Sequence, residues 1–131
     1  MDPALLDAMW FRLFAGFLFG LVLGSFTTML SYRAPRNISI INPPSHCPQC
    51  HTPLKPRDLV PVLSWMAEGG KCRHCKEAIS PRYLLIELAT TLGVMLAFAW
   101  IGFTPQVIVA IIGIVAFVAL VTINIERQRD N

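Results

Sequence analysis

The chain has 131 residues, of which 54% are hydrophobic and 15% are charged, and its mean hydropathy is +0.55. Soluble domains are about 45–50% apolar and about 25% charged, so this composition excludes an ordinary soluble domain and indicates a membrane protein. The net charge is +3, yet the stretch from Arg33 to Arg82 holds eight basic and three acidic residues, a local charge of +5. Between hydrophobic segments, a basic stretch of this kind reports the side of the bilayer that it faces.

The first hydrophobic segment runs from Trp10 to Ser31 and contains one charged residue, Arg12. Its length is close to the 20 residues or so that a helix needs to cross the hydrocarbon layer. A signal peptide is the alternative, but the positive n-region and the Ala-x-Ala cleavage site are missing and the apolar run is too long. We therefore expect a permanent membrane span.

Three glycines of this span, Gly16, Gly20 and Gly24, recur every four residues and fall on one helix face. Small residues at this spacing let a second helix approach closely. The alternative is the ordinary tolerance of membrane helices for glycine. On the first interpretation, this face is also a candidate docking surface for a helical substrate.

A proline-rich loop follows the first span, with seven prolines from Pro35 to Pro61. This density excludes long helices and predicts a loop built from turns. The one apolar patch of the loop, Val60 to Met66, is expected to pack under a site in the loop or to lie at the membrane interface, where tryptophan is favoured.

The second hydrophobic block, Tyr83 to Ile125, is 43 residues long. This is too long for one span, and Gly102-Phe103-Thr104-Pro105 divides it into residues 83–101 and 106–125, each about one bilayer in length. We expect a helical hairpin followed by a polar tail. The predicted organisation is a first transmembrane helix (1–32), a loop (33–82), and a hairpin with its tail (83–131).

Ten of the eleven Lys and Arg residues lie in the loop and the tail, which three spans place on the same side of the membrane. The positive-inside rule predicts that this side is the cytoplasm, with the amino terminus in the periplasm.

All four cysteines lie in the loop, as two Cys-x-x-Cys pairs 21 residues apart: Cys47, Cys50, Cys72 and Cys75. This spacing is close to that of zinc ribbons, in which four thiolates surround a structural zinc tetrahedrally. A disulfide or redox role is the alternative, but a reducing cytosol favours the metal. We predict an all-α integral membrane protein, with three transmembrane helices and a four-cysteine, zinc-ribbon-like cytoplasmic loop. Four-thiolate sites also hold iron, so the identity of the metal stays open.

Other polar residues adjoin the cysteines or the spans. His46, His51 and His74 neighbour the cysteines, and with four thiolates available we expect them to be solvated or to support the site. Glu87 lies about one turn inside the second span, where a charge is costly and marks a functional contact by default. The alternative is a glutamate near the headgroups that is hydrogen-bonded to Arg82 or to a loop amide.

Read in order, a series of motifs closely resembles the amino-terminal half of the type IV prepilin leader peptidases. The motifs are Gly24-Ser25-Phe26, Tyr32-Arg33-Ala34-Pro35, the first cysteine pair, Leu59 to Trp65, Gly70 to Cys75, Ile79 to Tyr83, and Glu87. Members of this family are bacterial inner-membrane aspartic peptidases. They remove the leader from type IV prepilins and type II secretion pseudopilins and then N-methylate the new terminus with S-adenosylmethionine.

The resemblance implies prepilin or pseudopilin substrates and S-adenosylmethionine as a cofactor. Family methyl transfer is associated with the cysteine-bearing loop. Gly70, Lys71 and Glu87 are therefore candidate substrate- or cofactor-binding residues. The alternative is that Gly70 serves the turn into the second cysteine pair and that Lys71 contributes solubility. No glycine-rich cofactor motif is present, so methyl transfer rests on the resemblance alone.

The sequence departs from the family at the catalytic aspartates. Asn124 stands where the first aspartate falls, and no Gly-x-Gly-Asp motif occurs in the sequence. Aspartic peptidases need two carboxylates that share a proton, which an amide cannot supply. We predict no peptidase activity from this chain alone. Two hypotheses remain: a non-proteolytic homologue that binds or methylates pilin-like proteins, or a structural half that needs a partner chain. Nucleic-acid binding is disfavoured because the basic loop lacks interleaved aromatic residues.

Overall fold

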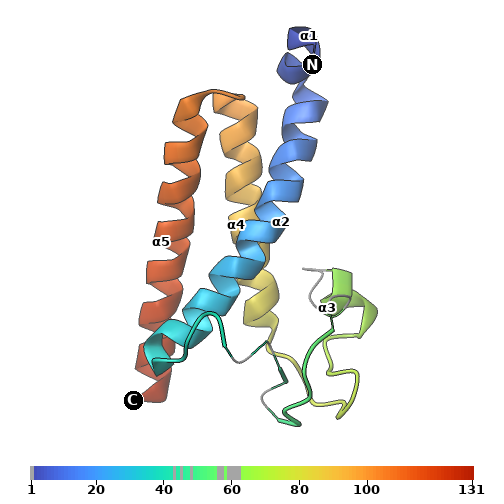
Figure 1. The fold of residues 1–131 in the computed structure, drawn as a ribbon, viewed down its shortest axis with the longest axis vertical. Helices are drawn as coiled ribbons and strands as arrows, with labels where there is room; N and C mark the ends of the chain where they lie inside the picture. Colours follow the sequence, from blue (N-terminus) through green and yellow to red (C-terminus); the bar gives the residue numbers. More distant parts are fainter. Residues whose placement is uncertain (1, 43, 45, 48, 56–57, 59–62) are drawn as a thin grey trace.

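The computed structural model describes residues 2–42, 44, 46–47, 49–55, 58 and 63–131. Three long helices form the body of the molecule (Figure 1): α2 (Met9–Arg33), α4 (Pro81–Ile101) and α5 (Pro105–Asp130). Each is long and apolar enough to cross a membrane. The described residues also form three short elements: α1 (Pro3–Asp7), the 3-10 turn η1 (Ala34–Arg36) and α3 (Leu63–Ala67). The described residues form no strand, which confirms the all-α prediction.

The predicted spans match the cores of the three helices, and the differences lie at their ends. Pro81 and Pro105 start α4 and α5, where proline lacks only an amide that would be unpaired anyway. Gly102, with φ 75°, ends α4 and allows the tight turn into α5. The first predicted span ended at Ser31, whereas α2 continues to Arg33 and is followed by η1, which contains Pro35.

The glycine face of α2 packs directly against α4. A Cβ atom at Gly16 would lie 2.7 Å from the Cα of Met95, and one at Gly20 would lie 2.6 Å from the Cα of Thr91. Gly24 makes a similar approach, and all three glycines are buried. The prediction that these glycines admit a second helix is confirmed. The proposed substrate-docking surface is corrected, because α4 of the same chain occupies this face.

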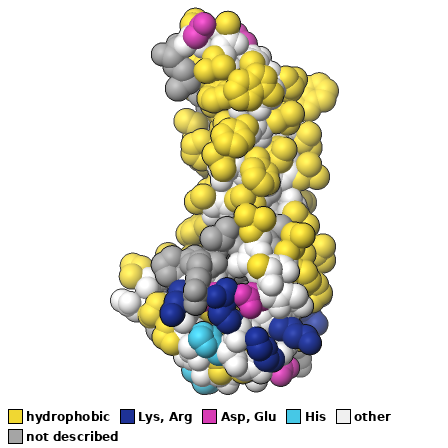
Figure 2. Space-filling model, turned by 90° about the vertical axis from the view of Figure 1, so that its right-hand side faces the viewer, with side chains coloured by type: hydrophobic (Ala, Val, Ile, Leu, Met, Phe, Trp, Pro, Cys, Tyr) yellow, Lys and Arg dark blue, Asp and Glu magenta, His cyan; other side chains and the backbone are white. Residues whose placement is uncertain are grey.

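The α5 helix packs against α2 and α4 with a narrower buried face. Its buried residues are Val107, Ala119 and Glu126. Val107 joins the apolar core of the bundle, whose other members are Val94, Ala97 and Phe98 of α4. Most remaining large apolar side chains of the helices are exposed, as Figure 2 shows along the length of the molecule. With three apolar helices exposed in this way, the chain is a multi-pass membrane protein.

Charged groups gather at the end of the molecule that carries the loop (Figure 2). Asp2, Asp7 and Arg12 are the charged residues near the opposite end. The Arg12 guanidinium pairs with Asp7 at 2.6 Å and donates to the backbone oxygens of Leu6 and Ala99. The charge inside the first predicted span is thus neutralised by α1 and tied to the end of α4.

Candidate functional site

The two cysteine pairs fold into two copies of one backbone turn. The amide of His51 donates to the oxygen of Cys47 at 2.9 Å, and the amide of Lys76 donates to that of Cys72 at 3.1 Å. His51 and Lys76 follow the second cysteine of each pair, and both have positive φ, 55° and 60°. Isolated β-bridges, His46 with Pro53 and Lys71 with Ala78, close each turn in the same register. The loop therefore presents two matching knuckles.

The four Sγ atoms of the knuckles converge, all within 4.8 Å of one another. Cys47 and Cys75 are 3.8 Å apart, and Cys50 and Cys72 are 3.9 Å apart. A tetrahedron of sulfurs about 2.3 Å from a zinc ion has edges of about 3.8 Å. These Sγ–Sγ distances are longer than the sulfur–sulfur bond of a disulfide, which is about 2 Å. The four thiols fit a tetrahedral metal ion, and zinc is the first candidate.

The thiol pKa values also suit a cation at the centre of the cluster. Hydrogen bonds from the side chain and backbone of Thr52 lower the pKa of Cys50 to about 6. For Cys75, a hydrogen bond from Glu77 lowers the pKa, but burial and the neighbouring thiols outweigh it and raise the pKa to about 11. The apposed thiols oppose full ionisation of the set, and a divalent cation removes that conflict because it stabilises all four thiolates.

Salt bridges brace the second knuckle. Arg73, which lies between its two cysteines, pairs with Glu68 and lies 3.3 Å from Asp58. The Asp58 side chain is 8% exposed, so this carboxylate is buried against its partner. Gly70 begins the knuckle with φ 73°, and a Cβ there would lie 2.8 Å from the Trp65 ring. The knuckle is thereby fixed to α3.

A cavity of about 300 Å³ lies between this loop and the helices. On the helix side it is lined by Ser25, Thr28 and Tyr32 of α2 and by Tyr83, Leu84 and Glu87 of α4. On the loop side it is lined by residues that include Trp65, Lys71, Cys72 and Arg73. The helix side of the cavity thus combines tyrosine rings and Leu84 with hydroxyl groups and Glu87, and the loop side adds charged groups at the knuckles.

The structure brings the predicted binding residues to this one cavity. Lys71 and Glu87, 16 positions apart in the sequence, both line it. Gly70 packs against Trp65, another wall residue. The Arg82 side chain, considered as a partner for Glu87, pairs with Glu126. The indole nitrogen of Trp65 is buried and has no hydrogen-bond partner among the described residues, so the wall retains a donor for a ligand.

Asn124 lies away from the residues that line the cavity. It is exposed on α5, on the face turned away from α2 and α4, whereas Glu126, two residues later, is buried. Successive helix residues are about 100° apart, so positions 124 and 126 point to nearly opposite sides.

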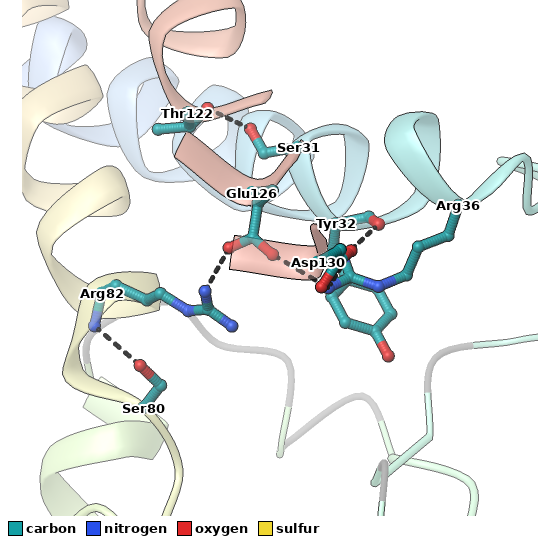
Figure 3. A network of polar contacts seen from close by, with 8 residues as sticks. All are labelled: Ser31, Tyr32, Arg36, Ser80, Arg82, Thr122, Glu126 and Asp130. Carbon is teal, nitrogen blue, oxygen red and sulfur yellow. Dashed lines mark hydrogen bonds and ion pairs between the residues drawn. The ribbon is translucent and has the colours of Figure 1, made fainter. Parts of the chain in front are cut away.

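Glu126 is the polar residue whose importance sequence reasoning missed (Figure 3). Its side chain is 7% exposed and pairs with Arg82 of α4 and with Arg36 of η1, the latter at 3.0 Å. Arg36 also pairs with Asp130 at 3.1 Å and lies over the Tyr32 ring, 4.3 Å from its centre. The Glu126 carboxylate thus joins α5 to α4 and, through η1, to the end of α2.

A second polar contact lies one turn further into the bundle, where Ser31 and Thr122 are hydrogen-bonded at 2.5 Å. Thr122, Glu126 and Asp130 recur every four residues of α5. That spacing marks one helix face and was the available signal for this network.

Comparisons with known proteins agree with the motifs. A family model described as Bacterial Peptidase A24 N-terminal domain matches residues 18–101. The chain is 38% identical to a prepilin leader peptidase/N-methyltransferase of Myxococcus xanthus (strain DK1622), over 88% of this chain and 35% of that protein. It is 34% identical to a protein of the same name from Dickeya chrysanthemi, over 88% of this chain and 49% of that protein.

A third relative, from Bacillus subtilis (strain 168) and with the same name, is 46% identical over 56% of this chain and 30% of its own length. The chain thus spans about a third to a half of the curated relatives that it matches. No solved structure matches the chain. The chain belongs to the family of the bacterial A24 peptidases, through their N-terminal domain.

Proposed function

We propose that this chain is a prepilin-processing homologue of the bacterial inner membrane that binds pilin-like proteins of type IV pili or type II secretion. The cavity between the metal loop and the helices α2 and α4 carries this proposal. On the helix side its wall combines aromatic and aliphatic groups with hydroxyl groups and Glu87, and on the loop side it carries charged groups at the knuckles. A pilin-like protein has an apolar amino-terminal segment, which suits a cavity that begins within the membrane and ends in a polar loop.

Each part of the cavity has a separate task in this proposal. Leu84 and Tyr83 contact the apolar segment, and Glu87 and Lys71 contact the polar groups that adjoin it. The metal holds the two knuckles together and so fixes the charged wall, as structural zinc does in small loops without a core of their own. The loop and the carboxyl terminus face the cytoplasm in this proposal, because they carry ten of the eleven basic residues.

The 131 residues alone bind without cleaving. Peptide hydrolysis in an aspartic site needs one carboxylate as base and a second as acid. Asn124 provides an amide at the first of these positions, and it lies on a different face from the cavity.

Methyl transfer is the second activity of this proposal. S-adenosylmethionine would supply the methyl group. The aromatic wall of Tyr32 and Trp65, with the unpaired indole N–H, suits a flat base, and Lys71 suits a carboxylate. The test incubates the purified chain with a leader-cleaved pilin peptide and labelled S-adenosylmethionine. Transfer of label by the unmodified chain, abolished in the Cys72→Ser variant, would support the activity. If the unmodified chain neither transfers label nor binds S-adenosylmethionine, the activity is refuted.

The alternative is a structural half of a peptidase that needs a partner chain. The exposed Asn124 face of α5 favours it, because the matching position of the family would there meet additional helices. Co-expression with a chain that carries both aspartates and the remaining spans distinguishes the two. Prepilin cleavage only by the pair supports the alternative, and cleavage unaffected by this chain refutes it.

Binding to the cavity is tested with a fluorescent peptide that contains the apolar amino-terminal segment of a pilin. We expect Glu87→Gln, in lipid nanodiscs, to weaken binding about tenfold, equivalent to about 1.4 kcal/mol. Arg129→Gln, on the exposed last turn of α5, is the matched control and leaves binding unchanged. Equal affinities for all three proteins would refute the cavity as the binding site.

A further inference from the structure

The short helix α3 (Leu63–Ala67) has an inverted distribution of side chains. Its exposed residues are apolar: Leu63 is 60% exposed and Met66 is 64% exposed. Its polar or amphipathic residues, Ser64 and Trp65, face the cavity, as does Glu68 just beyond the helix. In water this arrangement would expose the apolar side of α3 to unfavourable hydration. In contact with lipid the same apolar side would be favourably placed.

The position of α3 along the bundle supports contact with lipid. Its inner face shares the cavity with Ser25 of α2 and Glu87 of α4. Ser25 lies eight residues before the end of α2 and Glu87 six residues after the start of α4, depths of about 12 Å and about 9 Å along the helices. Figure 1 likewise shows α3 level with the first turns of α4, above the lowest part of the loop.

The neighbouring surface and charge fit the same occupant. The helices beside α3 expose large apolar residues at this depth, including Phe26 of α2 and Leu88 of α4, so the apolar side of α3 continues a surface that meets lipid. Glu68, at the end of α3, is neutralised by Arg73.

We propose that α3 is inserted into the interfacial layer of the bilayer, with Leu63 and Met66 among the acyl chains. The helix then forms the wall between the lipid and the cavity. An amphipathic segment in this layer is held by its buried apolar area and by attraction to anionic headgroups. The proposal rests on the membrane position of the chain and not on the binding of pilins.

The test uses the photoreactive amino acid p-benzoylphenylalanine, which forms covalent adducts with neighbouring C–H bonds. The full chain carries it at position 66, is placed in vesicles of phosphatidylethanolamine and phosphatidylglycerol, and is analysed by mass after irradiation. Position 117, an exposed phenylalanine in the span α5, is the positive control, and position 76, an exposed lysine of the second knuckle, is the negative control. Position 63 provides a second site if the variant at 66 fails to fold.

We expect lipid adducts at positions 63 and 66 at a yield similar to that at position 117 and at least tenfold above that at position 76. A yield at both sites equal to that at position 76 would overturn the proposal. Crosslinks from these sites to a second copy of the chain, in place of lipid, would also overturn it and would identify a protein as the occupant. The assay contains no pilin, so its result is separate from the proposed substrate binding.

Discussion

At the residue scale, the metal cluster depends on four thiols whose neighbours fix their positions. The two knuckles share their backbone hydrogen bonds and their positive φ values, so each turn is complete in itself. The two knuckles contact each other through the Sγ atoms of their cysteines. Cys47 faces Cys75, and Cys50 faces Cys72, so a metal held by all four thiolates would connect the two halves of the loop through both pairs.

Loss of one thiol should therefore remove the metal. We expect the unmodified chain to hold about one zinc ion, and Cys72→Ser to weaken zinc binding by at least about 100-fold, because even changes beside the ligands cost tenfold to 100-fold. Metal content measured by plasma mass spectrometry provides the readout. His74→Asn, at an exposed position in the same knuckle, should keep the metal. Retention of zinc by Cys72→Ser would contradict the four-thiolate site.

Glu126 carries the second residue-scale prediction. Glu126→Gln leaves two arginines without their shared anion, and we expect a loss of about 2 kcal/mol in the free energy of unfolding, as for hydrogen bonds to charged groups. Asp130→Asn is the control. It also removes a carboxylate that pairs with Arg36, but its side chain is 47% exposed, so the loss should stay below about 1 kcal/mol. Reversible unfolding in mixed micelles measures both, and equal losses would show that burial of Glu126 contributes nothing.

At the element scale, α2 and α4 are held together by close backbone approach, and α5 is held to them by apolar packing around Val107 and by polar contacts at its loop end. The glycine face allows α2 to touch the Cα atoms of α4. The α5 helix has a small buried apolar face, and its polar contacts through Thr122 and Glu126 fix the end that carries position 124. The orientation of Asn124 away from the bundle thus follows from the burial of Glu126.

The glycine contacts give a prediction with a matched control. Gly20→Ala places a Cβ 2.6 Å from the backbone of Thr91, so the helices must separate, and we expect a loss of about 1–3 kcal/mol in stability, as for overpacked cores. Gly113→Ala makes the same chemical change on α5, where no atom lies within 4 Å, and should not destabilise the fold. Thermal unfolding in detergent compares the two. Similar midpoints would contradict close α2–α4 packing.

At the scale of the whole molecule, the sequence predicted the features that depend on composition and spacing. Hydrophobic length located the three spans, Gly102 and Pro105 located the turn between two of them, and the cysteine spacing predicted the cluster. It did not predict contacts between distant segments. The pairing of Glu126 with Arg36 and Arg82 depends on how three helices converge, and the filling of the glycine face depends on which helix arrives there. The five-residue α3 is too short for periodicity to detect.

We propose that these 131 residues bind a pilin-like protein without cleaving it. The most direct measurement is to incubate the purified chain, in nanodiscs free of any longer homologue, with a full-length prepilin and to analyse both the captured protein and its size on a gel. A family member with both aspartates serves as the positive control for cleavage. We expect the chain to capture the prepilin and the captured prepilin to keep its full size. Leader-cleaved pilin, or prepilin that is not captured at all, would contradict the proposal.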